Sequence, residues 1–312
     1  MPERTMTDRL FVDPHIHLWD LAKLRYPWLT PPLDDGGPNG DIASIARTYL
    51  PADYLADASA WHIVGAVHID AGAHPGDAIR ETEWLAAQAD ATGLPTAIVA
   101  YAALDAPDVA GQLAAQAAHS RVRGIRQIVN WHADPKRTYT PRDVTGDAAW
   151  QRGFAQLAAH DLSFDLQCYP GQLAAVAAIA ARHPDTRVIL NHAGMPVDPD
   201  RAIWREGLRR LAALPNAAIK LSGFGFVVRD WTVEQIRPLI LEAIEIFGTN
   251  RAMFASDFPT DSLFGSFDRH LDAYHAIVAD FSDRERRALF ADNANRVYRL
   301  GLELPPGLPG LT

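Results

Sequence analysis

The chain has 312 residues, with 29 Lys and Arg against 38 Asp and Glu and a formal net charge of −9. Apolar residues make up 48% of it and charged residues 21%, the proportions of a globular protein that buries a full core without disulfides. The acidic balance argues against general nucleic-acid binding, because counterion release requires a basic surface. No stretch reaches the ~20 apolar residues of a membrane-spanning helix, so we expect no membrane partner.

The cysteine content and the first residues address the cellular compartment. Cys168 is the single cysteine, so no disulfide forms within the chain and a reducing compartment is favoured. The start, MPERTMTDRL, is charged and lacks the apolar core of a secretory signal. We therefore expect a cytoplasmic protein with a small-molecule substrate. The sequence leaves the oligomeric state open, including a homo-oligomer.

In chain order, short apolar runs alternate with segments of helical periodicity. The predicted strands are Leu10–His17, Ile63–Asp70, Thr96–Ala102, Val122–Trp131, Leu162–Tyr169, Val188–His192, Ala218–Phe224 and Met253–Phe258. Helical spacing is clearest in Ala78–Ala91, Asp147–His160, Gln172–Arg182 and Val233–Phe247. Eight such repeats predict an α/β protein with a single (β/α)₈ TIM barrel. The alternative, an open doubly wound sheet, usually carries a phosphate-binding glycine loop after an early strand, and this sequence has none.

One long segment interrupts the repeat. Residues 18–60 follow the first strand and contain the run YPWLTPPLDDGGPNG. A loop of this kind at the catalytic end of a barrel is more often a lid or a pocket wall than a separate domain. No low-complexity linker divides the chain, so residues 1–312 are expected to form one domain with a lid-like loop.

The ends of the predicted strands are unusually polar, and in a parallel barrel function collects there. His15 and His17 are two residues apart, so both side chains lie on one face of the first strand. His192 ends the sixth strand and Asp257 ends the eighth. Asp257 lies within the apolar run MFASDFP, where a carboxylate is costly to bury without a partner. These four residues are the predicted catalytic centre.

Other polar or aromatic residues near the strand ends are candidates for binding the substrate. They are Arg126, Gln127, Gln167, Tyr169, Lys220 and Trp131. Arg126 and Gln127 point to opposite faces of their strand, so only one of them can line the pocket. Arg126 would suit a substrate carboxylate through a bidentate contact. Lys220 could equally form an ion pair in the barrel floor.

The remaining histidines and the cysteine have simpler interpretations. His68 is at least as well explained as a hydrogen-bonded core residue. Cys168 is expected to be a packed thiol, because it lies on the face opposite Gln167. Histidines on predicted helices or loops are expected at the surface: His62, His74, His119, His160, His183, His270 and His275.

Several motifs recur in one known family in the order found here. They are His15-x-His17, GIRQ at 124–127, LNHAG at 190–194, KLSGF at 220–224, MFASDFP at 253–259 and the closing DNANRVYRL. Over Val12 to Leu300 the chain resembles the amidohydrolase superfamily, specifically its amidohydrolase 2 branch. Within that branch it is similar to the lactonases, the group that includes L-fuconolactonase and pyrone-dicarboxylate lactonase.

The resemblance implies a metal site. His15, His17, His192 and Asp257 match the family's strand-one, strand-six and strand-eight residues, and this set could hold one Zn²⁺ or Mn²⁺. Binuclear members need a lysine or glutamate on strand four and a histidine on strand five. This chain has Arg126 and Gln127 on the former and Gln167 on the latter, so a second ion is not expected. Some lactonases of the branch work without any metal, which leaves occupancy open.

The resemblance also implies a hydrolase that opens a lactone, or a related ester, of a small acidic compound such as a sugar acid or a dicarboxylate. Asp257 would activate the attacking water, and the histidines, with or without metal, would polarise the carbonyl. The alternative on the same scaffold is a zinc-dependent decarboxylase or a lactone isomerase. An inactive binding protein is disfavoured, because all four site residues are present.

Overall fold

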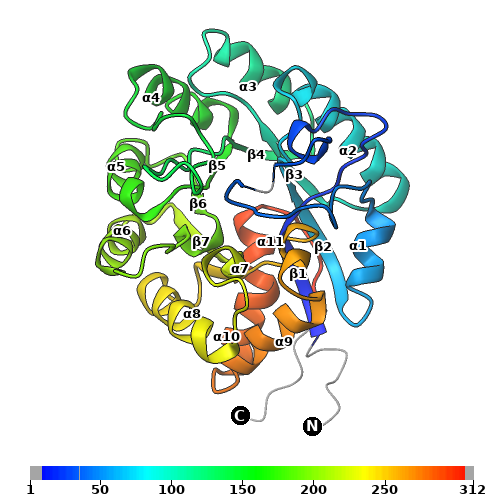
Figure 1. Ribbon diagram of the computed structural model, residues 1–312, viewed down its shortest axis with the longest axis vertical. Helices are drawn as coiled ribbons and strands as arrows, with labels where there is room; N and C mark the ends of the chain where they lie inside the picture. The colour runs from blue at the N-terminus through cyan, green and yellow to red at the C-terminus, as the bar shows by residue number, and fades with distance from the viewer. Residues whose placement is uncertain (1–8, 35, 306–312) are drawn as a thin grey trace.

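The computed structural model describes residues 9–34 and 36–305, and it confirms the predicted TIM barrel (Figure 1). Eight parallel strands follow one another around the sheet in sequence order. Their bounds are β1 Leu10–Ile16, β2 His62–Ile69, β3 Ala97–Tyr101, β4 Val122–Arg126, β5 Ser163–Leu166, β6 Val188–Leu190, β7 Ala217–Leu221 and β8 Ala252–Phe254.

Helices surround the sheet on its outer side (Figure 1). Those between the strands are α1 Pro51–Asp57, α2 Ala78–Thr92, α3 Val109–Ala117, α4 Ala148–Phe154, α5 Pro170–Ala180, α6 Ala202–Ala212, α7 Phe224–Val227 and α8 Val233–Phe247. After the last strand come α9 Phe267–Ile277, α10 Asp283–Arg287 and α11 Asn293–Val297. No helix within the described ranges has the length and apolar content that crossing a bilayer requires.

Several strands end earlier than the sequence predicted. The fourth was expected to reach Trp131, but β4 ends at Arg126. The apolar residues Ile128 and Val129 extend the strand-like pattern, although they lie in the loop, where Ile128 faces a cavity and Val129 is buried. Buried residues of this loop are apolar too, so the apolar pattern in the sequence continues beyond the true end of the strand. The prediction for the segment that forms α8 needed no correction.

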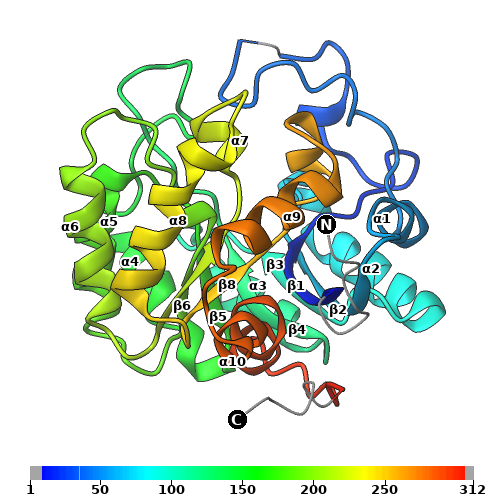
Figure 2. The ribbon, with the colours of Figure 1, turned by 90° about the horizontal axis from the view of Figure 1, so that it is seen from below.

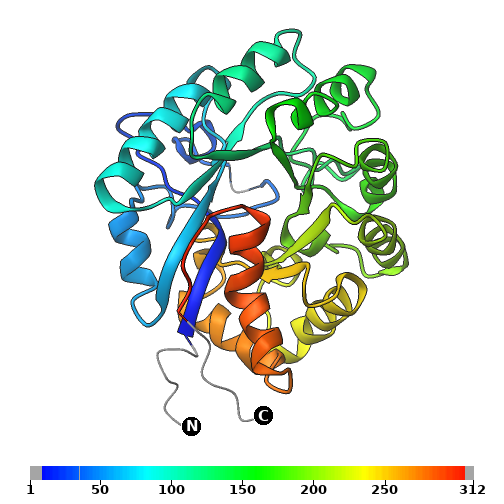
Figure 3. The same ribbon diagram turned by 180° about the vertical axis from the view of Figure 1, so that it is seen from behind.

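Apolar side chains fill the lower half of the barrel. Val12, Val67 and Met253 point inward from their strands and pack together. Tyr298, which caps the end of α11, belongs to the same cluster. Figure 3 shows α11 lying across this end of the barrel. Apolar packing thus closes most of the floor, and the hydroxyl of Tyr298 donates to the buried Asp165 over 2.6 Å.

The barrel closes between β8 and β1 without a regular ladder. The backbone N–H of Asp257 donates to the carbonyl of His15 over 2.9 Å, and that of His17 donates to the carbonyl of Phe258 over 2.8 Å. Below them, Oδ1 of the buried Asp13 accepts from the backbone N–H of Ser256 over 3.1 Å. This seam places the end of β8 directly beside the histidines of β1.

The long loop after β1 lies at the polar end of the barrel (Figure 2). Trp19 and Tyr49 exchange two backbone hydrogen bonds, of 3.0 and 2.9 Å, which bring its two ends together. Nε1 of Trp28 donates to the carbonyl of Ala71 over 2.8 Å and holds the loop against the end of β2. Asp35 lies outside the described residues. The position suits a pocket wall, and a lid function stays a prediction.

Candidate active site

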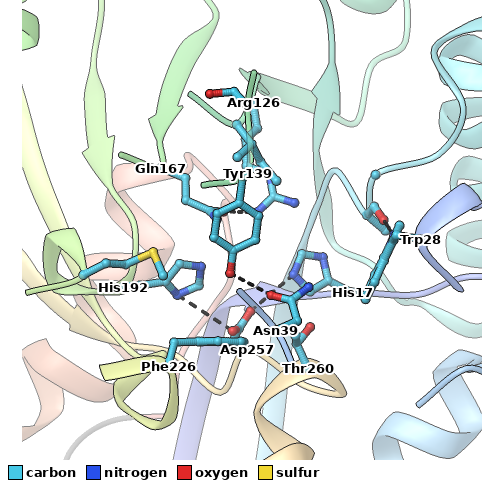
Figure 4. Close-up of a pocket in the computed structure, with 15 residues that line it drawn as sticks. His17, Trp28, Asn39, Arg126, Tyr139, Gln167, His192, Phe226, Asp257 and Thr260 are labelled. Carbon is cyan, nitrogen blue, oxygen red and sulfur yellow. Dashed lines mark hydrogen bonds and ion pairs between the residues drawn. The ribbon is translucent and has the colours of Figure 1, made fainter. Parts of the chain in front are cut away.

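Four polar residues meet at the centre of the barrel mouth. Nε2 of His15 lies 3.3 Å from Oδ1 of Asp257, and Nε2 of His17 lies 3.2 Å from the same oxygen. Nδ1 of His192 lies 3.8 Å from the other carboxylate oxygen. Figure 4 shows three of these residues around one cavity. The structure thus brings together all four residues singled out from the strand ends, and their catalytic role stays a prediction.

Neighbouring groups fix the orientation of these side chains. Nδ1 of His17 donates to the carbonyl of Ile69 at the end of β2 over 2.8 Å. Nδ1 of His192 lies 3.1 Å from the hydroxyl of Ser222, just beyond β7. The backbone itself is also unusual here, because His192 and Asp257 have φ of 53° and 57°, in the left-handed region. Such conformations for residues other than glycine cost free energy and concentrate at functional sites.

Burial and neighbouring groups shift the pKa values of the ionisable side chains in this site. Burial lowers the pKa of His192 to about 4 and that of His15 well below its ordinary value. Burial alone would raise the pKa of Asp257. The neighbouring rings of His192 and His17, together with Arg126, overcome this effect and hold that pKa below its usual range. Asp257 is therefore a carboxylate at neutral pH, as a general base must be.

Three of these residues suit a divalent cation, whereas His192, the fourth ligand expected from the sequence, is not part of the group. One ligand atom each from His15, His17 and Asp257 lie within 4.8 Å of one another, and all three residues are buried. Oδ1 of Asp257 is buried without a hydrogen bond in the described structure. A buried carboxylate oxygen with no hydrogen bond is available as a metal ligand. Two imidazoles and a carboxylate are typical zinc ligands. The donor set therefore fits a metal, and its limit of one ion stays a prediction.

A cavity of about 260 Å³ opens above these residues. Its lining includes His17, His192, Asp257 and Arg126. The other polar residues that line it are Asn39, Tyr139, Thr140, Gln167 and Thr260. Its larger apolar side chains are Trp28, Ile128, Met195 and Phe226. The hydroxyl of Tyr139 donates to Oδ1 of Asn39 over 2.7 Å and joins the loop after β4 to the loop after β1 (Figure 4). The cavity is thus closed on one side by a hydrogen bond between two loops.

Arg126 faces the barrel interior and lines the cavity, but its guanidinium is already engaged. Nη1 donates to Oε1 of Gln167 over 2.8 Å, and Nε donates to Oδ2 of Asp70 over 3.4 Å. Nη2 donates to the backbone carbonyl of Asp70. Both charged side chains are buried. Each guanidinium nitrogen therefore has a protein partner, and the charge of Arg126 is opposed by Asp70.

The prediction that Gln127 binds the substrate is corrected by its position. Its Oε1 accepts from the backbone N–H of Leu104 and from Nε1 of Trp150, both over 3.0 Å. Its Nε2 donates to Asp105 over 2.9 Å. Gln127 thus faces the helices, as strand alternation requires once Arg126 faces inward. Gln167, by contrast, lines the cavity.

Three further candidates lie away from the cavity. Tyr169 directly precedes α5, beyond the end of β5, so strand alternation no longer directs its side chain, and its hydroxyl donates to the carbonyl of Arg137. Trp131 is 40% exposed. Lys220 is fully buried and lies 2.5 Å from Oδ1 of Asp165, the ion-pair alternative considered for it. None of these three is among the residues that line the cavity.

Some residues at the site, or near it, had no useful signal in the sequence. Asn39, Tyr139 and Thr260 come from loops, where neither period-two nor helical spacing exists to indicate their direction. His270 was expected at the surface, but it is 1% exposed and its Nε2 lies 3.1 Å from the carbonyl of Asp261. His68 is buried as a core histidine and its Nδ1 accepts from a backbone N–H over 3.1 Å, but its Nε2 has no hydrogen-bond partner in the described structure.

Comparisons with known proteins agree with this geometry. The amidohydrolase family model matches residues 12–300. An L-fucono-1,5-lactonase of Burkholderia multivorans is 32% identical over 93% of this chain and 96% of its own length. An uncharacterised protein of Sinorhizobium fredii is 44% identical over 95% of this chain and all of its own. The crystal structure of an amidohydrolase from Burkholderia multivorans with bound zinc has a TM-score of 0.77 and 30% identity, and covers 94% of this chain and all of its own.

The breadth of these matches decides the family. Each extends over more than nine tenths of the chain, and the range of the family model, 12–300, contains both strand-one histidines, His192 and Asp257. The fold, the order of the motifs and the convergence of the four residues are all those expected from the resemblance seen in the sequence. The chain is an enzyme, a hydrolase that belongs to the amidohydrolase family.

Proposed function

We propose that this hydrolase opens the ring of an uncharged, polyhydroxylated lactone, such as a sugar 1,5-lactone, and releases the free acid. The central observation is an ionised, buried Asp257 that faces three imidazoles at the bottom of a cavity of about 260 Å³. The relative that is an L-fucono-1,5-lactonase supports the same reaction class.

Asp257 is proposed as the general base. It removes a proton from a water molecule as the water oxygen attacks the lactone carbonyl carbon. When the tetrahedral intermediate collapses, the bond from the carbonyl carbon to the ring oxygen breaks. Asp257 then returns the proton to the leaving alkoxide, so water is consumed and one carboxylic acid with a new hydroxyl is formed. Its surroundings keep it ionised before each turnover.

The electrophilic part of the reaction falls to groups around the carbonyl oxygen. His192 and His17 both line the cavity, and we assign to His192 the stabilisation of the negative charge that develops on the carbonyl oxygen. Arg126 contributes positive potential from the cavity wall without giving up its protein partners. A divalent ion held by His15, His17 and Asp257 would act as a Lewis acid toward the carbonyl and its water.

The charges at the cavity favour an uncharged substrate over a dicarboxylate. Among the described residues that line the cavity, Arg126 is the sole Lys or Arg. Its charge is paired with that of Asp70. Asp257 would repel a nearby carboxylate. We therefore propose a different role for Arg126 from the carboxylate clamp suggested by the sequence: it holds Gln167 in place. Hydroxyl and amide groups such as Tyr139 and Asn39 suit substrate hydroxyls.

Acid release from a panel of lactones tests this proposal. The purified enzyme is mixed with aldono-1,5-lactones, aldono-1,4-lactones and pyrone dicarboxylates, and acid is titrated with a pH indicator against the uncatalysed rate. We expect the highest kcat/KM for an uncharged sugar lactone, with one acid equivalent per turnover. Preference for a dicarboxylate would overturn the substrate class. Carbon dioxide from an aromatic acid, or conversion of a lactone without acid release, would identify the decarboxylase or the isomerase instead.

A further inference from the structure

We propose that Asp261 is a positioning residue of the active site: it holds the end of β7 against the ring of His192 and so keeps that ring in place. Asp261 follows β8 in a short 3₁₀ helix, Thr260–Leu263, and it is fully buried. It is not among the residues that line the cavity, so it acts through its neighbours. Its part in catalysis rests on the proposed lactone hydrolysis, in which His192 stabilises the developing negative charge.

The side chain of Asp261 meets the backbone that follows β7. Its Oδ2 accepts a hydrogen bond from the backbone N–H of Gly223 over 3.0 Å. Its Oδ1 is buried without a hydrogen-bond partner among the described residues. Burial of a carboxyl group with so few hydrogen bonds costs free energy, and apolar residues of similar volume often serve a fold equally well. The presence of a carboxyl group here therefore points to a task for its contact with Gly223.

Gly223 is in close contact with His192. Its φ is 69°, in the left-handed region, and a Cβ atom on it would lie 2.8 Å from both Cβ and Nδ1 of His192. The preceding residue, Ser222, places its hydroxyl oxygen 3.1 Å from the same Nδ1. Glycine is thus required here both for its backbone conformation and for its lack of a side chain. A shift of this backbone would push the imidazole or open a gap beside it.

The contacts form a closed ring that includes two residues of the proposed mechanism. The backbone N–H of Asp261 donates to the carbonyl of Asp257 over 2.9 Å. Oδ2 of Asp257 lies 3.8 Å from Nδ1 of His192 (Figure 4). His192 in turn contacts Ser222 and Gly223. The hydrogen bond from Gly223 to Asp261 completes the ring. One residue thus ties the end of β8 to the end of β7, and the placement of His192 beside Asp257 depends on it.

The backbone strain at His192 makes this support necessary. Its φ of 53° is in the left-handed region, which a residue other than glycine adopts at a cost and keeps only where its surroundings hold it. One support comes from Trp204, whose Nε1 donates to the carbonyl of Ala193 over 2.7 Å. Gly223 supplies another from the end of β7. Loss of the contact with Asp261 would release this second support and let the ring of His192 move from its place.

Two substitutions of Asp261 separate the effect of the hydrogen bond from that of the charge. Asp261→Asn keeps an oxygen that accepts from Gly223, whereas Asp261→Leu has a similar size and no acceptor. We expect kcat of Asp261→Leu to fall at least tenfold with KM within threefold of wild type, because the residue acts on the ring and does not touch the substrate. Asp261→Asn should keep kcat within threefold. Equal losses of kcat in both variants, or a folded Asp261→Leu variant with kcat within threefold of wild type, would overturn the proposal.

Asn293→Leu is the matched control for a loss of stability. Asn293 is buried at the start of β8, where its Nδ2 donates to the carbonyls of Thr249 and Ala252, both over 2.7 Å. Its substitution should lower the melting temperature and leave kcat per folded molecule unchanged. A fall in kcat equal to that of Asp261→Leu would show that lower stability alone reduces turnover, which would overturn the proposal. The assay uses whichever compound of the panel the wild type converts fastest, so a wrong substrate class does not affect the comparison.

Hydrogen exchange followed by NMR in the wild type tests the contact itself, without any substrate. We expect the N–H of Gly223 to exchange at least ~10²-fold more slowly than an unprotected amide. Exchange at the unprotected rate would overturn the proposal, and this measurement decides if Asp261→Leu does not fold. If the wild type opens no lactone but the exchange is slow, the proposed function fails while the contact of Asp261 with Gly223 stands.

Discussion

Nη1 of Arg126 donates to Oε1 of Gln167 over 2.8 Å, and this bond joins the site ends of β4 and β5. The same guanidinium reaches Asp70 at the end of β2. One buried side chain therefore ties together three strand ends that are not all neighbours in the sheet. Arg126, which the sequence suggested as a partner for a substrate carboxylate, thus has protein partners for its guanidinium and forms part of the cavity wall.

Removal of Arg126 should mainly affect stability. Arg126→Met leaves the buried carboxylate of Asp70 unpaired, a change that typically costs about 3–5 kcal/mol. For a chain of 312 residues the melting temperature should fall by roughly 5–8 °C. Differential scanning calorimetry measures the change. Arg126→Met combined with Asp70→Asn should recover at least half of the loss, while a single variant that melts within about 2 °C of wild type would contradict this role.

Asp257→Asn should separate chemistry from folding. The amide is nearly isosteric with the carboxylate, so the fold is kept, but it cannot accept a proton from water. We expect kcat to fall by at least ~10²-fold, the low end for loss of a general base. Melting temperature and kcat are measured on one preparation. A much lower melting temperature with nearly normal turnover per folded molecule would remove Asp257 from the mechanism.

Glu81 should make stability depend on pH. Burial and then the charge of Asp70 raise its pKa from 4.5 to about 8, and it accepts a hydrogen bond from Tyr26 over 2.9 Å. Between these two values the folded protein keeps a proton that the unfolded chain has lost, so the free energy of unfolding falls as pH rises through this window. Glu81→Gln mimics the protonated form and removes the dependence.

The difference in melting temperature between Glu81→Gln and wild type measures this effect. It should be close to zero near pH 5 and should increase, in favour of the variant, up to about pH 8. A difference that stays constant over the range would show that Glu81 has an ordinary pKa.

Tyr139→Phe should weaken substrate binding without slowing the chemical step. It removes the hydroxyl that meets Asn39 at the cavity. A neutral hydrogen bond contributes about 0.5–1.5 kcal/mol, which corresponds to an increase in KM of roughly 2–13-fold. Tyr169→Phe is the control, since that hydroxyl meets a backbone carbonyl outside the cavity, and its KM should be unchanged. A tenfold loss in kcat for Tyr139→Phe would instead place the phenol in the reaction.

The strands and the meeting of four polar residues at one end of the barrel could be predicted because both follow a period in the sequence. His15 and His17 share a face by strand alternation, and the eight-fold repeat places His192 and Asp257 at the same end of the barrel. Strand alternation also predicted that only one of Arg126 and Gln127 lines the cavity, but it could not decide that this residue is Arg126. That choice depends on the partners each side chain finds in other strands.

The cavity wall could not be predicted, for a physical reason. Asn39 and Tyr139 are one hundred residues apart and meet only because two irregular loops cross the mouth. Loop direction depends on individual turns and contacts, which leave no regular spacing of apolar residues. His270 could not be predicted for another reason. It lies on a regular helix, but a polar residue type gave no indication that its side chain is buried among aromatic rings.

The left-handed backbone at His192 and Asp257 has a consequence for the evolution and engineering of this barrel. Glycine adopts such conformations freely, whereas other residues pay about 1–3 kcal/mol for them. A glycine at either position would remove the backbone strain, but it would also remove a side chain of the site. Selection for thermal stability alone would therefore favour a more stable protein without activity. Stabilising substitutions should therefore be sought on the outer helices, where a gain in stability does not cost activity.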